Sequence, residues 1–209
     1  MFLTVKAHSL TGIAPNLAPL LGPDTAVVSA QNGIPWWYFM GHGGPFDGES
    51  IESVDPGGVI AGAIDQSRII GCVIYPSTAI VEPGVIEHIE GNRFSLGELD
   101  GSSSDRCKRL AGAFIAAGLR APIRGHIRHD MWIKLLGNVV FNPMSALTGA
   151  TLVEMVTHPE TSATVRAVMT EADEVAQGLG VRLPFTVEQR MEGARKVGEI
   201  GRASCRERV

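Results

Sequence analysis

The chain has 209 residues, of which 44% are hydrophobic and 19% are charged, and its formal net charge is −4. This composition is that of a globular protein with one large domain or two smaller ones. The mild acidity and the lack of a basic stripe argue against nucleic-acid binding, and no apolar run reaches the roughly 18 residues that a membrane-spanning helix needs. Three irregularly spaced cysteines fit reduced thiols and a cytoplasmic location better than a disulfide framework.

In the first half of the chain, glycine and proline separate short apolar runs. The runs predict strands at 2–7, 25–30 and 68–75, with a short helix at 12–21. Because they are continuous rather than alternating, they indicate a parallel sheet covered on both faces. Two further runs, 85–89 and 93–96, resemble an antiparallel hairpin at the sheet edge.

An aromatic segment, Pro35–Phe39, follows the second predicted strand. Its rings could stack on a base or a nicotinamide. We favour the other reading, in which they pack against the sheet or a second domain.

The second half of the chain has helical periodicity. An amphipathic helix is predicted at 103–118 and a short strand or linker at 121–125. From Arg128 onward the pattern is helical, with the helix that holds Lys134 followed by helices at 151–156, 160–180 and 186–197. We therefore expect a first domain at 1–127 and a helical domain at 128–198. Clefts between domains are preferred sites for small ligands.

Lys134, Asn138 and Asn142 are four residues apart in W-I-K-L-L-G-N-V-V-F-N-P. At about 100° per residue they fall within roughly 80° of one helix face, among leucine, valine and phenylalanine. A cation and two amides aligned in this way can bind a small polar molecule. The alternative is a solvated lysine beside amides that have partners in the core.

Two polar residues fall at the carboxyl ends of predicted strands, where parallel sheets bind ligands. Asn32 follows the second strand, and Lys6 ends the first and could face a phosphate. The alternative for Asn32 is an ordinary turn, since Asn-Gly is a common turn dipeptide. The sequence has no GxGxxG, Walker loop, HExxH or GxSxG motif, and its histidines have no metal-ligand spacing.

The chain resembles the ketopantoate reductases, also called 2-dehydropantoate 2-reductases, over roughly residues 2–198. The resemblance is carried by V-K-A at 5–7, Q-N-G at 31–33, the P-G-V-I-E-H-I and F-S-L-G-E segments, and W-I-K-L-L-G-N-V-V-F-N-P-M-S-A-L-T at 132–148. The last motif is specific, because Lys-x3-Asn-x3-Asn-Pro after tryptophan is not a generic pattern.

The resemblance implies NADPH-dependent reduction of 2-dehydropantoate to pantoate, on the way to pantothenate and coenzyme A. It makes Lys134 the catalytic lysine and Asn138 and Asn142 substrate-binding residues. Asn32 would lie near both nicotinamide and substrate. Lys6 and Pro76 would contact the cofactor. A further asparagine of the family has no match here, since Thr151 and Leu152 occupy that stretch.

The implied fold is α/β: a partial Rossmann-type, doubly wound nucleotide-binding domain that lacks its first βαβ unit, followed by an all-α C-terminal domain that is also truncated. From this we expect weak NADPH binding and impaired folding. Glu199–Val209, E-I-G-R-A-S-C-R-E-R-V, resembles a translated sequencing adapter. We expect this tail to be non-native; the alternative is a disordered basic tail.

Two other functions stay open. One is a related NAD(P)-dependent reductase of another 2-oxo acid, because the amide stripe does not reveal the substrate's side chain. The other is a non-catalytic dimerisation or binding module built on the helices. The choice between NADP and NAD and the oligomeric state, a homodimer included, also stay open.

Overall fold

The structure, a computed structural model, describes residues 1–196. The predicted non-native tail, Glu199–Val209, lies outside the described residues. The chain divides into two compact units, which are described separately: unit 1 is Met1–Pro76 with Glu90–Met131, and unit 2 is Ser77–Ile89 with the chain from Trp132 on. The predicted division between residues 127 and 128 stays a prediction. Within 1–196, no helix has the length and hydropathy required to cross a bilayer.

Unit 1 contains a four-stranded sheet in the order β1-β2-β3-β6. Its strands are β1 Phe2–Leu3, β2 Val27–Ser29, β3 Ile69–Ile74 and β6 Phe94–Gly97. The first three are parallel, and β6 runs antiparallel to β3. The prediction of three parallel strands is therefore confirmed, although β1 and β2 are shorter than predicted.

The single helix predicted at 12–21 is wrong. Short helical segments replace it. One is an α-helical turn, α1 Leu10–Ile13, and the others are 3₁₀ helices, labelled η: η1 Ala7–Ser9, η2 Ala14–Asn16 and η3 Ala18–Leu20. Pro15 and Pro19 lie in the first turns of η2 and η3. Proline lacks an N–H and clashes with the preceding turn, so it can begin a helical segment but not continue one.

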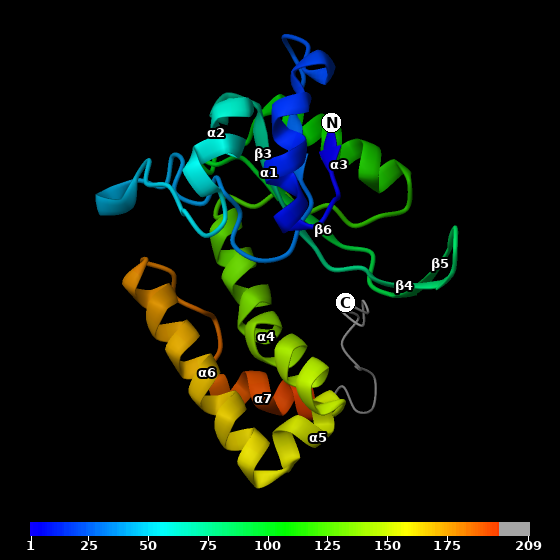
Figure 1. The fold of residues 1–209 in the computed structure, drawn as a ribbon, viewed down its shortest axis with the longest axis vertical. Coiled ribbons are helices and arrows are strands. Elements are labelled where there is room, and N and C mark those ends of the chain that lie inside the picture. Colours follow the sequence, from blue (N-terminus) through cyan, green and yellow to red (C-terminus); the bar gives the residue numbers. More distant parts are fainter. Residues whose placement is uncertain (197–209) are drawn as a thin grey trace. The chain divides into compact units, whose positions relative to one another are not determined.

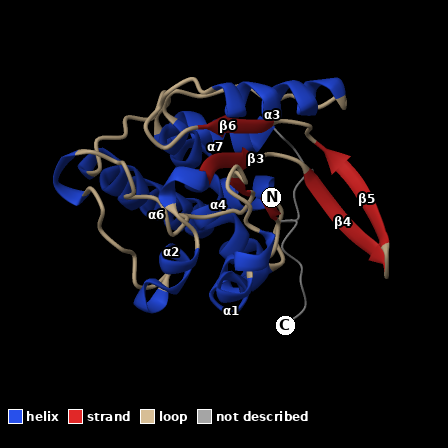
Figure 2. Ribbon diagram, turned by 90° about the horizontal axis from the view of Figure 1, so that it is seen from above, coloured by secondary structure: helices blue, strands red, loops and turns tan. Residues whose placement is uncertain are grey.

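The predicted pairing of 85–89 with 93–96 is also wrong. β5 Val85–Glu90 pairs with β4 Ser77–Glu82 in a separate two-stranded sheet, seen in Figure 2. Pro83 and Gly84 form the connection, with Gly84 at φ +83°. Proline followed by glycine at positive φ is the pattern of a type II turn, which reverses the chain between β4 and β5. β6 pairs instead with β3, joining Ile74 to Phe94 and Gly71 to Gly97.

Helix α3, Asp105–Ala116, covers one face of the sheet (Figure 2). It begins at Ser104, whose hydroxyl accepts a hydrogen bond from the Cys107 backbone N–H at 3.1 Å, as an N-cap should. Cys107 and Ala111 are buried with Ile70, Cys72 and Leu96 of the sheet. The other helical segments of unit 1 are α2 Val59–Ala63, η4 Gly44–Phe46, η5 Pro56–Gly58 and η6 Gln66–Arg68.

A pair of glycines makes room on the other face of the sheet. Gly71 and Gly97 are partners across β3 and β6. A Cβ atom on Gly97 would lie 2.5 Å from the Arg124 carbonyl oxygen and 3.0 Å from Ile127, and one on Gly71 would lie 2.9 Å from Trp37. The absence of both side chains lets the start of helix α4 lie directly against the sheet.

Unit 2 is largely helical, with α4 Ile127–Thr148, α5 Leu152–Thr157, α6 Pro159–Gly178 and α7 Val187–Lys196 (Figure 1). α4 begins in unit 1 and continues in unit 2. Thr151 and Glu154 form a reciprocal capping box at the start of α5.

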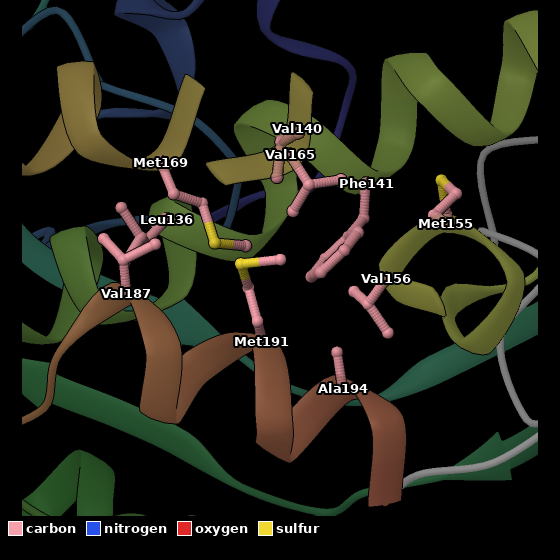
Figure 3. Close-up of a cluster of buried hydrophobic side chains, with 10 residues drawn as sticks. All are labelled: Leu136, Val140, Phe141, Met155, Val156, Val165, Met169, Val187, Met191 and Ala194. Carbon is pink, nitrogen blue, oxygen red and sulfur yellow. The ribbon is translucent and has the colours of Figure 1, made fainter. Parts of the chain in front are cut away.

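The core of unit 2 contains side chains from all four helices. In Figure 3, Phe141 of α4, Met169 of α6 and Met191 of α7 point toward one another. Burial of each large apolar side chain contributes about 1.5–3 kcal/mol. This core fixes which side of α4 faces inward.

Substituting alanine for Gly97 tests whether the glycine pair sets the approach of α4. We expect Gly97→Ala to lower the free energy of unfolding by about 1–3 kcal/mol, the usual cost of overpacking, because the added methyl meets the Arg124 backbone. The control is Gly112→Ala in α3, where a Cβ meets nothing within 4 Å and alanine is expected to stabilise by about 0.5–1 kcal/mol. Urea unfolding measures both, and equal effects would refute the argument.

Candidate functional site

The three polar residues predicted to share a helix face do so on α4. Lys134, Asn138 and Asn142 all lie within this continuous 22-residue helix, and each is partly buried. At about 100° per residue they span about 80°. Leu136 and Val140 enter the core from the far side of the helix, and Phe141, about 20° from Lys134, enters it beside the stripe. Lys134 and Asn142 also interact with other groups of the protein. The polar stripe therefore runs along one edge of the side of α4 that the apolar core buries.

Ser145 belongs to the same stripe but was missed by the sequence analysis. It lies eleven residues, or about three turns, beyond Lys134, which returns it to about 20° from that lysine. Its side chain is buried, with 9% of the residue exposed, and it interacts within the structure. Extending the helical period past Pro143 is the signal that would have found it.

Pro143 lies inside α4 without ending it. Because proline has no N–H, it leaves the carbonyl of Val139 without its helical donor.

In unit 1, the residues predicted at strand ends follow three neighbouring parallel strands. Lys6 follows β1 and precedes η1, Asn32 follows β2, and Pro76 follows β3. Gln31 holds two of these segments together, because its side-chain amide donates to the Val5 carbonyl at 2.7 Å. Lys6 and Asn32 are exposed at this edge and have partners in the structure.

A pocket opens beside Asn32. It is a small hollow, with a cavity volume of about 10 Å³, and most of its lining is apolar: Ala7, Leu10, Ile34, Pro35, Trp36, Val54 and Ile60, with Gln31 and Asn32. Trp36, Trp37 and Tyr38 are all buried, and Trp37 packs on Gly71 of the sheet. The preferred reading of the aromatic segment, packing against the sheet, is thus confirmed for Trp37.

Arg128 fixes the first turn of α4 within unit 1. Its guanidinium donates to the carbonyl oxygens of Tyr38 at 2.7 Å, Met40 at 2.6 Å and Leu99 at 2.7 Å. Burial lowers the pKa of Arg128 from its ordinary value, and the carbonyl contacts offset the cost of removing the cation from water. Lys134 lies six residues further along this helix.

The predicted residues therefore form two groups, one in each unit. Unit 1 brings Lys6, Asn32 and Pro76 to one edge of the sheet, and unit 2 aligns Lys134, Asn138 and Asn142. Among residues 1–196, no cluster of three or more His, Cys, Asp or Glu side chains is arranged to hold a metal ion. The stripe in unit 2 offers an ammonium and two carboxamides.

Comparisons with known proteins identify the family. Residues 1–101 match the family described as Ketopantoate reductase PanE/ApbA, and residues 126–205 match its C-terminal region. A 2-dehydropantoate 2-reductase from Mesorhizobium japonicum is 51% identical over 197 residues, covering 94% of this chain and 60% of that protein. The chain belongs to the ketopantoate reductase family.

Solved structures of similar proteins support the same family and fold. A candidate ketopantoate reductase from Ralstonia solanacearum MolK2 matches with a TM-score of 0.90 and 41% identity, over 95% of this chain and 61% of that one. D-mandelate dehydrogenase, solved with NADH and anilino(oxo)acetate, matches in fold, with a TM-score of 0.73 at 18% identity over 93% of this chain and 56% of that one. The predicted fold class, a Rossmann-type α/β region followed by helices, is confirmed. The chain spans about three-fifths of the length of the Mesorhizobium and Ralstonia relatives.

Replacing Arg128 with methionine tests how firmly α4 is held. We expect Arg128→Met to lower the free energy of unfolding by about 2–4 kcal/mol, because buried carbonyl oxygens lose a charged donor. Arg109→Met is the control, since Arg109 is exposed on α3, and its effect should stay within about 0.5 kcal/mol. Equal midpoints in urea for the two variants would contradict the assigned role.

Proposed function

We propose that the protein reduces 2-dehydropantoate to pantoate with NADPH. The observation that carries the proposal is the stripe of Lys134, Asn138 and Asn142 on one partly buried side of α4, in a chain of the ketopantoate reductase family. An ammonium beside two carboxamides suits a 2-oxo acid that also has a hydroxyl group. The assignments of these residues are proposals.

Lys134 is the proton donor in this proposal. As negative charge grows on the C2 oxygen of the substrate, the Lys134 ammonium stabilises that charge and delivers the proton, acting as a general acid. Asn138 and Asn142 orient the substrate, because each amide offers both donors and an acceptor to its hydroxyl and carbonyl groups. Ser145 adds a hydroxyl on the same stripe.

The edge of unit 1 suits the cofactor. Lys6, Asn32 and Pro76 follow three neighbouring parallel strands, the place where doubly wound sheets bind nucleotides. Mostly apolar side chains line a small hollow beside Asn32, next to this edge. When bound there, the nicotinamide supplies the hydride. In this proposal Lys6 binds a cofactor phosphate, and Asn32 lies near both the nicotinamide and the substrate.

A second candidate is reduction of another 2-oxo acid by the same residues. It is favoured by the fold likeness to D-mandelate dehydrogenase, which was solved with an oxoacetate compound and NADH. Oxidation of NADPH and of NADH, each assayed with ketopantoate, pyruvate and 2-oxoisovalerate, separates the candidates. The main proposal requires the highest kcat/KM for ketopantoate with NADPH. A higher value for either other acid would favour the second candidate. No turnover with any of them, in protein shown by fluorescence titration to bind NADPH, would refute both.

Removing the Lys134 ammonium tests the chemistry directly. We expect Lys134→Ala to lower kcat by roughly 10²–10⁴-fold, the usual contribution of general acid catalysis. Lys108→Ala, at an exposed position on α3, is the control and should leave kcat unchanged. Steady-state NADPH oxidation measures both variants, and near wild-type turnover of Lys134→Ala would remove this lysine from the mechanism.

A further inference from the structure

Arg190 of α7 lies directly against the helix that has the polar stripe. Its Nη2 atom is 2.5 Å from the place that a Cβ of Gly137 would occupy. Gly137 is therefore a position where the absence of a side chain lets a guanidinium approach the α4 backbone. Both residues lie in unit 2, and neighbouring Val187, Met191 and Ala194 attach α7 to the core.

This guanidinium has no hydrogen-bond acceptor and no ion-pair partner among residues 1–196. Other cations nearby are paired: Arg166 with Glu188, and Arg195 with Glu192 at 2.7 Å. Burial lowers the pKa of Arg190, and no neighbouring charge acts against that shift. Arg190 is partly exposed, so a guanidinium without a partner in the described residues is open to an anion that the chain itself does not supply.

The position of Gly137 puts that anion beside the proposed proton donor. Residues three apart on a helix have Cβ positions about 5–6 Å apart, so the position against which the Arg190 guanidinium lies is a direct neighbour of Lys134 on α4. Asn138 borders the same lysine from its other side, four residues along. Arg190, Lys134 and Asn138 thus follow one another around α4 in the order cation, ammonium, amide.

We propose that Arg190 binds the carboxylate of the 2-oxo acid substrate, an inference that rests on the proposed function. A guanidinium accepts a carboxylate through two parallel N–H···O bonds. With C1 held there, the adjacent C2 ketone lies next to Lys134, and the rest of the substrate extends along α4 toward Asn138 and Asn142. The same cation explains selection of an acid over an uncharged ketone.

The competing explanation is structural: the side chain of Arg190 fills the space above Gly137. Packing of this kind would be kept by a methionine of similar length. Recognition of a carboxylate would be lost, because methionine has no charge and no N–H donor. A pair of ligands that differ only in charge separates the two, namely 2-oxoisovalerate and its methyl ester.

The test is titration calorimetry of the 209-residue protein with these two ligands. The variants are Arg190→Met, Arg190→Lys and, as a control, Arg182→Met, because Arg182 is an exposed arginine before α7. We expect wild type and Arg182→Met to bind the acid more tightly than the ester. Arg190→Met should bind the acid about 10- to 100-fold more weakly with unchanged ester affinity, and Arg190→Lys should recover part of the difference. The unchanged ester affinity reports that the variant is folded.

Each contrary outcome has a separate meaning. If Arg190→Met keeps the preference for the acid, Arg190 does not bind the carboxylate, and the proposed function stands without it. If wild type binds acid and ester equally, no cation reads the carboxylate and the inference fails. If wild type binds neither ligand, the proposed function fails together with the inference.

Discussion

The candidate site depends on the fixed orientation of one helix. α4 has an apolar side buried against α5, α6 and α7. Its first turn is held by the hydrogen bonds of Arg128, and it lies close to the sheet because Gly71 and Gly97 have no side chains. With rotation about the helix axis fixed in this way, residues four apart must emerge together along one edge of the buried side. The alignment of Lys134, Asn138 and Asn142 follows from that constraint.

The same constraint explains which parts of the site the sequence predicted. Residues on one helix are related by a constant rotation, so the Lys134 stripe could be read from spacing alone, and Ser145 could have been read in the same way. Asn32 and Lys6 were found because parallel strands end at a common edge. Both rules are local, and neither requires knowledge of which elements pack together.

Pairing and packing between distant segments could not be read in this way. The runs at 85–89 and 93–96 are neighbours in sequence, yet β5 pairs with β4 and β6 pairs with β3. Only the turn at Pro83 and Gly84 distinguished these possibilities. No sequence pattern indicates a role for Arg190, because the proposed role depends on its approach to Gly137 on another helix. The apolar run at 12–21 suggests one helix, but Pro15 and Pro19 divide it into shorter helical segments because proline cannot continue a helix.

The central claim is that the polar stripe of α4 binds a 2-oxo acid through its ketone. A crystal structure of the protein with ketopantoate tests it most directly. The account predicts that the C2 oxygen lies within hydrogen-bond distance of Lys134 Nζ, with the substrate hydroxyl beside the amides of Asn138 and Asn142. Ketopantoate bound away from this stripe, or with its ketone pointing away from Lys134, would contradict the account.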